Sequence, residues 1–148
     1  MTTLTPGSQA GLKSTRTQAH PFCLVCSQSN PLGLGLEFTV HDDGSVSTSF
    51  LGHSALEGFQ GFLHGGMIAS LLDGAMTNCL FAHGHVAMTG ELKVRYREPV
   101  VIGVENAHPR LDYAVPVAAS RARGGIEARG LHPGDRFGQI HRAQWHTQ

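Results

Sequence analysis

The chain lacks any apolar run that approaches the roughly 18 residues of a membrane-spanning helix. It also lacks an excess of charge, because eleven basic and eleven acidic residues give a formal net charge of zero. A protein that binds nucleic acid through general electrostatics needs a basic surplus. We therefore expect neither a nucleic-acid nor a membrane partner. The length of 148 residues fits one domain with a real core.

Residues 1–20 lack the apolar stretch of a secretory signal and show no hydrophobic period. They are rich in Thr, Ser, Gly and Gln, a composition that buries little apolar surface. We expect a disordered tail over residues 1–20, a single domain over residues 21–148 and a cytoplasmic location.

Cysteine is scarce, with three residues at positions 23, 26 and 79. An odd number without a secretory signal does not suggest a disulfide framework. The run His20-x-x-Cys23-x-x-Cys26 has the spacing of half a zinc site. A structural tetrahedral site takes four ligands, and no second pair follows. We expect reduced, partly buried thiols and no bound metal.

The first half of the domain contains a predicted hairpin. Residues 36–40 alternate apolar and polar side chains, which is typical of a half-buried strand. Residues 41–45 supply a turn with two aspartates and a glycine, and residues 46–50 form the returning strand. A loop over residues 52–63 then leads to the middle of the chain.

The most informative stretch begins at His64-Gly65-Gly66 and continues as an apolar helical run to about Phe81. The first N–H groups of a helix have no partner within it, and the two glycines leave them open to an electron-rich oxygen. Asp73 lies nine residues after His64, within the apolar run. A carboxylate in such a place needs a partner or a function. The motif predicts a carbonyl-polarising N–H together with a base or a nucleophile.

The predicted helix has two faces at about 100° per residue. A wide apolar stripe consists of Met67, Ile68, Leu71, Leu72, Ala75, Met76 and Cys79. The opposite face is small and polar, with Gly66, Ser70, Asp73 and Thr77. Such a face commonly meets solvent. Beside the His-Gly-Gly motif, we expect it to face a site or a subunit partner.

Residues 88–99 alternate over a long stretch and predict a long strand with one wet face. The parity expected to pack on the helix comprises Met88, Leu92, Val94 and Tyr96. The parity expected to face water comprises Glu91, Lys93, Arg95 and Arg97. Strands, a helix and then more strands predict an α+β fold.

The sequence changes in character from about Val104. Six of the eleven basic residues lie here, all of them arginine, and residues 118–125 follow neither a strand nor a helix period. Only stretches such as residues 139–145 alternate like a strand. The C-terminal strands are therefore doubtful, although the sheet needs more strands to cover its helix. We expect residues after 104 to bury few apolar side chains.

A reading-frame shift in the gene is one explanation for this atypical segment. Codons compatible with residues 116–145, read one base later, can encode two alternating strands joined by a charged turn. The other explanation is an unusual but genuine tail. Resequencing the gene across the codons for residues 101–114 distinguishes the two.

Three motifs occur together between Phe22 and Gly103. The first is Cys-x-x-Cys-Ser-x-x-Asn-Pro-x-Gly-Leu-Gly-Leu over residues 23–36, and the second is His64-Gly65-Gly66 with Asp73. The third is Thr-Gly-Glu-Leu-Lys-Val-Arg-Tyr-Arg-Glu-Pro over residues 89–99. This combination resembles the hotdog-fold acyl-CoA thioesterases, in the branch that includes the phenylacetate-pathway enzymes.

The resemblance implies a hotdog fold, in which an antiparallel sheet wraps a long central helix. It implies a homodimer or homotetramer with active sites between subunits, and hydrolysis of an acyl-CoA thioester without a cofactor. The Gly65 N–H would polarise the thioester carbonyl, and His64 would shape the loop. Asp73 would attack the carbonyl or activate a water molecule, which Thr89 would orient.

The chain departs from the family at Gly58, where many relatives carry an Asn six residues before the His. Glu57 and Gln60 are nearby polar substitutes. Gln60 is preferred for holding a water molecule, because an amide both donates and accepts hydrogen bonds. Gly66 is expected to contribute to substrate binding. Arg95 and Arg97 are expected to meet the coenzyme A phosphates, unless their strand face is simply solvated.

Other functions on the same fold stay open at this point. A dehydratase or hydratase would centre on an Asp/His pair in a different segment. A non-catalytic acyl-CoA-binding protein would keep the pocket without the chemistry. A damaged C-terminus would give an inactive product. No serine or cysteine lies in the setting of a nucleophile elbow, which argues against a catalytic triad.

Overall fold

The computed structural model describes residues 7–96, 98–102, 110–115, 120–122, 125–128 and 139–147, with side chains up to residue 102. Its helices are α1 (Gln9–Ala19), the short 3₁₀ helix η1 (Ser54–Leu56) and α2 (Gly65–Ala82). Its strands are β1 (Thr39–Val40), β2 (Val46–Leu51), β3 (Ala87–Arg95), β4 (Arg110–Val115), β5 (Ser120–Ala122), β6 (Gly125–Ala128) and β7 (Gln139–Thr147).

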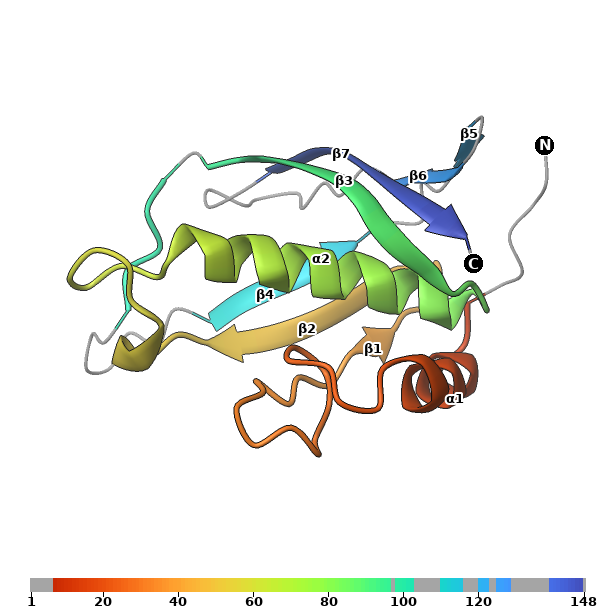
Figure 1. Ribbon diagram of the computed structural model, residues 1–148, viewed down its shortest axis with the longest axis horizontal. Coiled ribbons are helices and arrows are strands. Elements are labelled where there is room, and N and C mark those ends of the chain that lie inside the picture. The colour runs from red at the N-terminus through yellow and green to blue at the C-terminus, as the bar shows by residue number, and fades with distance from the viewer. Residues whose placement is uncertain are drawn as a thin grey trace.

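Helix α2 lies between two antiparallel sheets (Figure 1). One sheet has the order β1-β2-β4 and the other β3-β7-β6-β5. Helix α1 packs against α2 on the side away from β3 (Figure 1). A long central helix wrapped by antiparallel strands confirms the expected α+β architecture. Within the described part of the chain, no helix combines the length and apolarity needed to cross a bilayer.

The predicted hairpin forms as β1 and β2, with Val40 paired to Val46, but its first strand covers only Thr39–Val40 of the predicted residues 36–40. Its turn is closed by the Ser45 N–H, which donates to Asp43 Oδ1 at 2.9 Å. Gly44 adopts a φ of 79°, a conformation that L side chains rarely take. The residues predicted to form the turn therefore do connect β1 to β2.

The expected disordered tail is wrong for residues 9–19, which form α1. The Ser8 hydroxyl caps this helix by accepting from the Gly11 N–H at 3.0 Å. Leu12, its one fully buried side chain, is 1% exposed in the core. Gln9 also donates to the Phe38 carbonyl at 2.9 Å. With only one buried apolar side chain, α1 shows no hydrophobic period by which the sequence could have predicted it. Residues 1–6 lie outside the described part.

Helix α2 forms the centre of the core and begins and ends where the sequence predicts, within one residue. Its apolar stripe is buried, apart from Met67, which is half-buried. The small polar face is only partly open, because Asp73 is half-buried and Thr77 is 5% exposed. Gly66 is exposed and Ser70 is half-buried, and the expectation that this face meets a site or a subunit partner stays a prediction.

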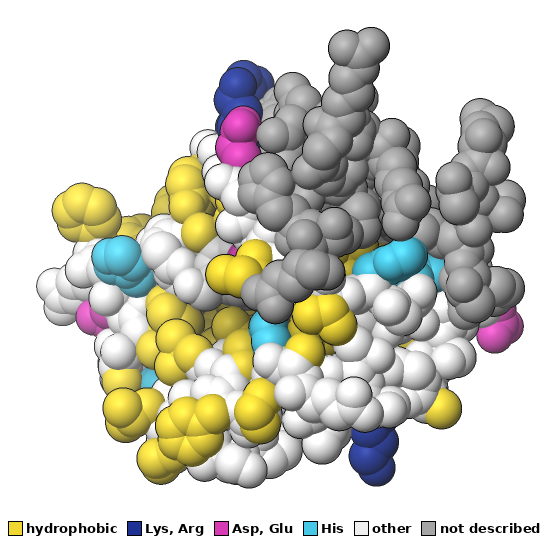
Figure 2. All heavy atoms as spheres, turned by 45° about the vertical axis from the view of Figure 1, so that its right-hand side comes forward, with side chains coloured by type: hydrophobic (Ala, Val, Ile, Leu, Met, Phe, Trp, Pro, Cys, Tyr) yellow, Lys and Arg dark blue, Asp and Glu magenta, His cyan; other side chains and the backbone are white. Residues whose placement is uncertain are grey.

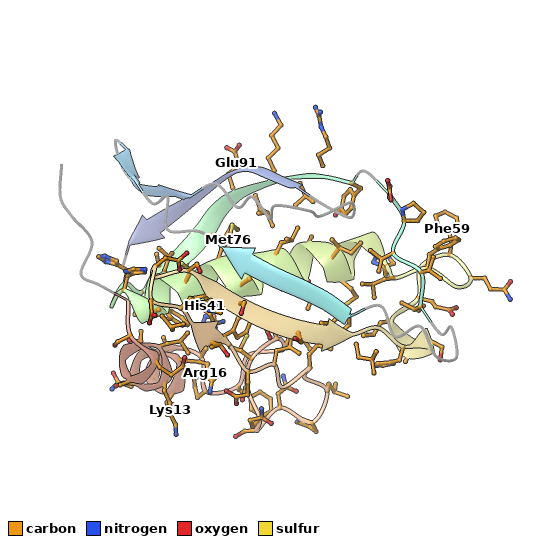
Figure 3. The ribbon with its side chains drawn as sticks, turned by 180° about the vertical axis from the view of Figure 1, so that it is seen from behind. Lys13, Arg16, His41, Phe59, Met76 and Glu91 are labelled. Carbon is orange, nitrogen blue, oxygen red and sulfur yellow. The ribbon has the colours of Figure 1, made fainter. Side chains whose placement is uncertain are left out.

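Strand β3 does not keep the predicted parity along its whole length. Thr89 is half-buried, whereas Met88 is 62% exposed. The register with β7 shifts between Thr89 and Glu91, and this irregularity exchanges the two faces of the strand. Beyond it the prediction holds, because Leu92 and Val94 pack on the core and Glu91 points away from α2 (Figure 3).

The backbone after residue 104 contains more strand than its sequence suggests. Strand β7 covers the one stretch that alternates, whereas β5 lies where no period was found. Strand β4 pairs with β2 over its full length, from Val46 opposite Val115 to Leu51 opposite Arg110. The expectation that these residues bury few apolar side chains concerns side chains outside the described part, so it stays a prediction.

Candidate active site

Asp73 and Thr89 meet at the interface between α2 and β3. The Thr89 hydroxyl donates to Asp73 Oδ1 at 2.5 Å, and both side chains are half-buried. Thr89 faces the helix because of the irregularity that follows it in β3. One carboxylate oxygen is thus held by a hydroxyl. The structure brings together the two site residues that lie sixteen positions apart in the sequence.

The start of α2 is organised by His64. Its Nδ1 accepts a hydrogen bond from the Gly66 N–H at 2.9 Å, so the imidazole caps the helix. A ring nitrogen that accepts carries no proton, which assigns the proton of a neutral ring to Nε2. His64 therefore fixes the first turn of α2, and its role in the site stays a prediction. The Gly66 N–H is occupied by this cap and is not the open donor that the sequence suggested.

Gly65 keeps its N–H open. No described residue accepts a hydrogen bond from it, and its position at the first turn of α2 excludes a partner within the helix. The next N–H groups, of Met67 and Ile68, are both occupied by the His64 carbonyl, at 2.9 and 3.2 Å. Gly65 thus presents a single backbone donor at the positive end of the helix dipole.

Tyr96 is a site residue that the sequence analysis did not single out. Its hydroxyl donates to the Gly65 carbonyl at 2.9 Å, which ties the end of the long strand to the start of α2. Its ring lies 3.7 Å from where a Gly65 Cβ would stand. The signal was its shared parity with the helix-facing residues Leu92 and Val94, which gave it a packing role only.

An apolar pocket of about 610 Å³ opens beside Gly65. It is lined by Phe59, Phe62, Leu63, Gly65, Ile68, Tyr96, Glu98, Pro99 and Val100. Phe59 stands on the loop before α2 (Figure 3) and is 85% exposed. A pocket of this size and lining suits an apolar chain.

The loop residues proposed to hold a water molecule are not brought to Asp73. Gln60 is exposed in the turn after Phe59, and none of the hydrogen bonds among described side chains involves it. Gly58 instead packs against the histidine, because a Cβ there would lie 3.1 Å from His64 Cδ2 and 3.2 Å from His64 Cα. Gly58 stands where many relatives carry an Asn. Because it has no side chain, it leaves room for the His64 ring that caps α2.

Arg95 and Arg97 are the two arginines expected to meet the coenzyme A phosphates. Arg95 is exposed at the end of β3, on the face that points away from α2. Arg97 lies outside the described residues. Lys and Arg side chains are sparse among the described atoms of the face in Figure 2. A role in binding phosphates stays a prediction for both.

Cys79 is unsuited to nucleophilic catalysis. It lies on α2 and is 7% exposed, and burial, with a smaller contribution from the Asp43 charge, raises the pKa of its thiol to about 12. The thiolate, which is the reactive form, is therefore scarce at neutral pH. Burial therefore argues against Cys79 as a catalytic nucleophile.

A family model described as the thioesterase superfamily matches residues 60–113. This stretch includes Gly65, Asp73, Thr89 and Tyr96. Over 72 residues the chain is 38% identical to acyl-coenzyme A thioesterase THEM4 of Mus musculus, which covers 46% of this chain and 30% of that relative. The chain thus matches about a third of the length of the curated relative.

Solved structures show the same fold at low sequence identity. The PaaI protein of E. coli, from the phenylacetic acid degradation operon, superposes with a TM-score of 0.61 at 16% identity over 78% of this chain and 80% of that chain. The smu.793 protein of Streptococcus mutans, solved bound to acetyl CoA, gives a TM-score of 0.60 at 14% identity over 76% of this chain and 88% of that chain. The fold and the family match confirm the resemblance to the hotdog-fold thioesterases.

Proposed function

We propose that the chain is an acyl-CoA thioesterase, which hydrolyses a thioester to a carboxylic acid and free coenzyme A. The observation that carries the proposal is the half-buried Asp73, held by the Thr89 hydroxyl on the helix that begins with the open Gly65 N–H. A carboxylate base and a preorganised N–H are the two groups that thioester hydrolysis needs. The thioesterase relatives described above support the same reaction.

Asp73 acts as the base in this proposal, or attacks the carbonyl itself. As a base, it takes a proton from a water molecule while the water oxygen attacks the carbonyl carbon. Negative charge builds on the carbonyl oxygen, where the Gly65 N–H donates a hydrogen bond. Collapse of the tetrahedral intermediate breaks the carbon–sulfur bond and expels the coenzyme A thiolate. A thiolate leaves readily, so the site requires no strong general acid.

One chain does not bring Gly65 and Asp73 to the same carbonyl. They are eight residues apart on α2, which is about 12 Å along the axis at a rise of about 1.5 Å per residue. A donor on the carbonyl oxygen and a base on the attacking water have to lie closer, since each works at about 3 Å. We therefore propose a homodimer, alone or within a homotetramer, in which Gly65 of one subunit faces Asp73 of its partner.

The apolar pocket beside Gly65 is the proposed site for the apolar part of the substrate. Its position next to the open N–H supports this assignment, because an apolar chain bound there would lie within reach of the proposed oxyanion donor. Ordinary apolar side chains line it, so a range of acyl or aryl groups fits by chemistry alone. The three free cysteines agree with a reducing compartment, which supports a cytoplasmic location.

A panel of acyl-CoA substrates with a thiol-trapping dye tests the proposal. Short, medium and long acyl groups and an aryl-acetyl group span the chemistry that the pocket admits. We expect release of free thiol on at least one substrate and loss of that release in Asp73→Asn. Saturable binding without thiol release would instead indicate an acyl-CoA-binding protein and would contradict the enzymatic function.

A further inference from the structure

A second cluster of reactive side chains begins at His20, the residue that caps the C-terminal end of α1. We call it the thiol–imidazole cluster: His20, Cys23 and Cys26. Their ligand atoms all lie within 4.8 Å of one another, and Cys26 Sγ is 3.9 Å from His20 Nδ1. Both cysteines are free. The proposed hydrolytic site uses none of these residues.

The backbone around the cluster forms a tight turn that directs one N–H group at a sulfur atom. His20 ends α1 with its N–H bonded to the Arg16 carbonyl at 2.8 Å, and the chain then turns so that the Ser27 N–H donates to the Cys23 carbonyl at 3.1 Å. Within this turn the Val25 N–H donates to Cys23 Sγ at 3.4 Å. Such N–H groups stabilise a metal-bound thiolate and fix its direction.

Neighbouring side chains hold the remaining ligands in place. The fully buried Phe81 meets the His20 ring edge-on, with the ring centroids 4.8 Å apart at 88°. The Asn78 side chain, 0% exposed, interacts with the Cys26 thiol. Asn78 Oδ1 is buried without a hydrogen-bond donor among the described residues. A buried oxygen without a donor is costly, so Asn78 marks a polar spot in the core beside Cys26.

We propose that His20, Cys23 and Cys26 bind a zinc ion, with a water molecule in the fourth position. Two thiolates and an imidazole favour zinc as the bound metal, whereas magnesium and calcium favour oxygen ligands. Ligand atoms stand about 2.0–2.3 Å from zinc, so the three atoms need to close by only about 1 Å. The water reaches the metal from a neighbouring polar pocket of about 270 Å³, which His20 and Cys26 help to line.

The bound ion would join three parts of the molecule. It links the end of α1 through His20 to the turn that carries both cysteines. That turn is pressed onto α2, since Val25 Cγ1 stands 2.6 Å from where a Gly74 Cβ would lie. Zinc binding therefore stabilises the folded chain as a ligand that favours the native state.

The test is metal content of the full chain purified from zinc-supplemented culture without chelators. We expect about one zinc per chain, measured by elemental mass spectrometry, and a higher melting temperature with zinc than after chelation. Cys23→Ser alters a half-buried ligand and should lower zinc affinity roughly tenfold or more. Cys79→Ser is the matched control, because it changes a buried cysteine outside the cluster and should keep the metal.

Cobalt(II) provides a second readout that does not depend on stability. Two thiolate ligands give a sulfur-to-cobalt charge-transfer absorption, which should appear in wild type and Cys79→Ser and weaken in Cys23→Ser. The proposal is overturned if the wild type takes up no zinc or cobalt, or if Cys23→Ser binds as tightly as the control. It is also overturned if the purified protein carries a Cys23–Cys26 disulfide, seen as a mass two hydrogens lower before reduction.

Discussion

The two sides of α2 differ in how completely they are filled. On the side of β3, Asp73 and Thr89 form a polar pair that stays half-buried. On the side of α1 and the cysteine turn, Gly74 and Asn78 are fully enclosed, and Gly74 is in contact with Val25. One helix thus supplies both a reactive surface and a packed core. The half-buried side is where chemistry is expected, and the filled side is where stability is expected.

Asp73→Asn should give the largest loss of activity on the β3 side of α2 while leaving stability nearly unchanged. The amide keeps the size of the side chain, and its oxygen can still accept from the Thr89 hydroxyl. It lacks the basic charge, so we expect kcat to fall about 10²–10⁴-fold with little change in melting temperature. The check is steady-state hydrolysis of the best acyl-CoA substrate. Near-full turnover by the variant would remove Asp73 from the mechanism.

Gly65→Pro tests the backbone donor, which no side-chain exchange can reach directly. Proline removes the N–H yet suits the first position of a helix. His64 already has φ −61° and ψ 133°, the extended conformation required before proline. We expect kcat to fall about 10²–10³-fold. Gly65→Ala keeps the N–H and should retain most activity; equal loss in both variants would show that space, not the donor, matters.

Thr89→Val should have a smaller effect on the same side of α2. It keeps the shape of the side chain and removes the hydroxyl that donates to Asp73. A hydrogen bond to a charged group contributes about 1.5–3 kcal/mol, so we expect kcat to fall about tenfold or more. Thr89→Ser should restore the donor and most of the rate. Unchanged kinetics in Thr89→Val would show that the contact is structural only.

Gly74→Ala probes the filled side and should leave catalysis nearly unchanged. The added Cβ would stand 2.6 Å from Val25 Cγ1, so the cysteine turn has to shift. Overpacking of this kind costs about 1–3 kcal/mol of unfolding free energy. Chemical denaturation measures that loss, and the assay for free thiol measures kcat. A large fall in kcat with no loss of stability would show that the Gly74 side of α2 serves catalysis and not stability.

The sequence was most informative where a motif and a period agreed. The helix of residues 65–82 carries both an apolar stripe and a His-Gly-Gly start, and the hairpin turn carries Asp43 and Gly44; both form as expected. The role of His64 in shaping the loop was implied by the family resemblance, and its cap on the Gly66 N–H is consistent with that role. Strong local signals of this kind require no knowledge of distant contacts.

The failures arose from long-range contacts. Helix α1 depends on Leu12 reaching a distant core and on Gln9 binding β1, which no local pattern shows. Thr89 faces Asp73 only because the register of β3 shifts after it. The Tyr96 hydroxyl finds the Gly65 carbonyl across thirty-one positions of sequence. His20 lies beside Cys23 and Cys26 at the C-terminal end of α1, a helix that the sequence did not predict.

In the proposed dimer, Asp73 of one chain and Gly65 of another form each active site. Mixing inactive Asp73→Asn and Gly65→Pro chains, with dissociation and reassociation, tests it directly. Random pairing makes half of the dimers mixed, and each mixed dimer has one site with both groups intact. If the two groups act across the subunit interface, the mixture should recover about a quarter of the wild-type specific activity. A mixture no more active than the two variants measured separately would contradict it.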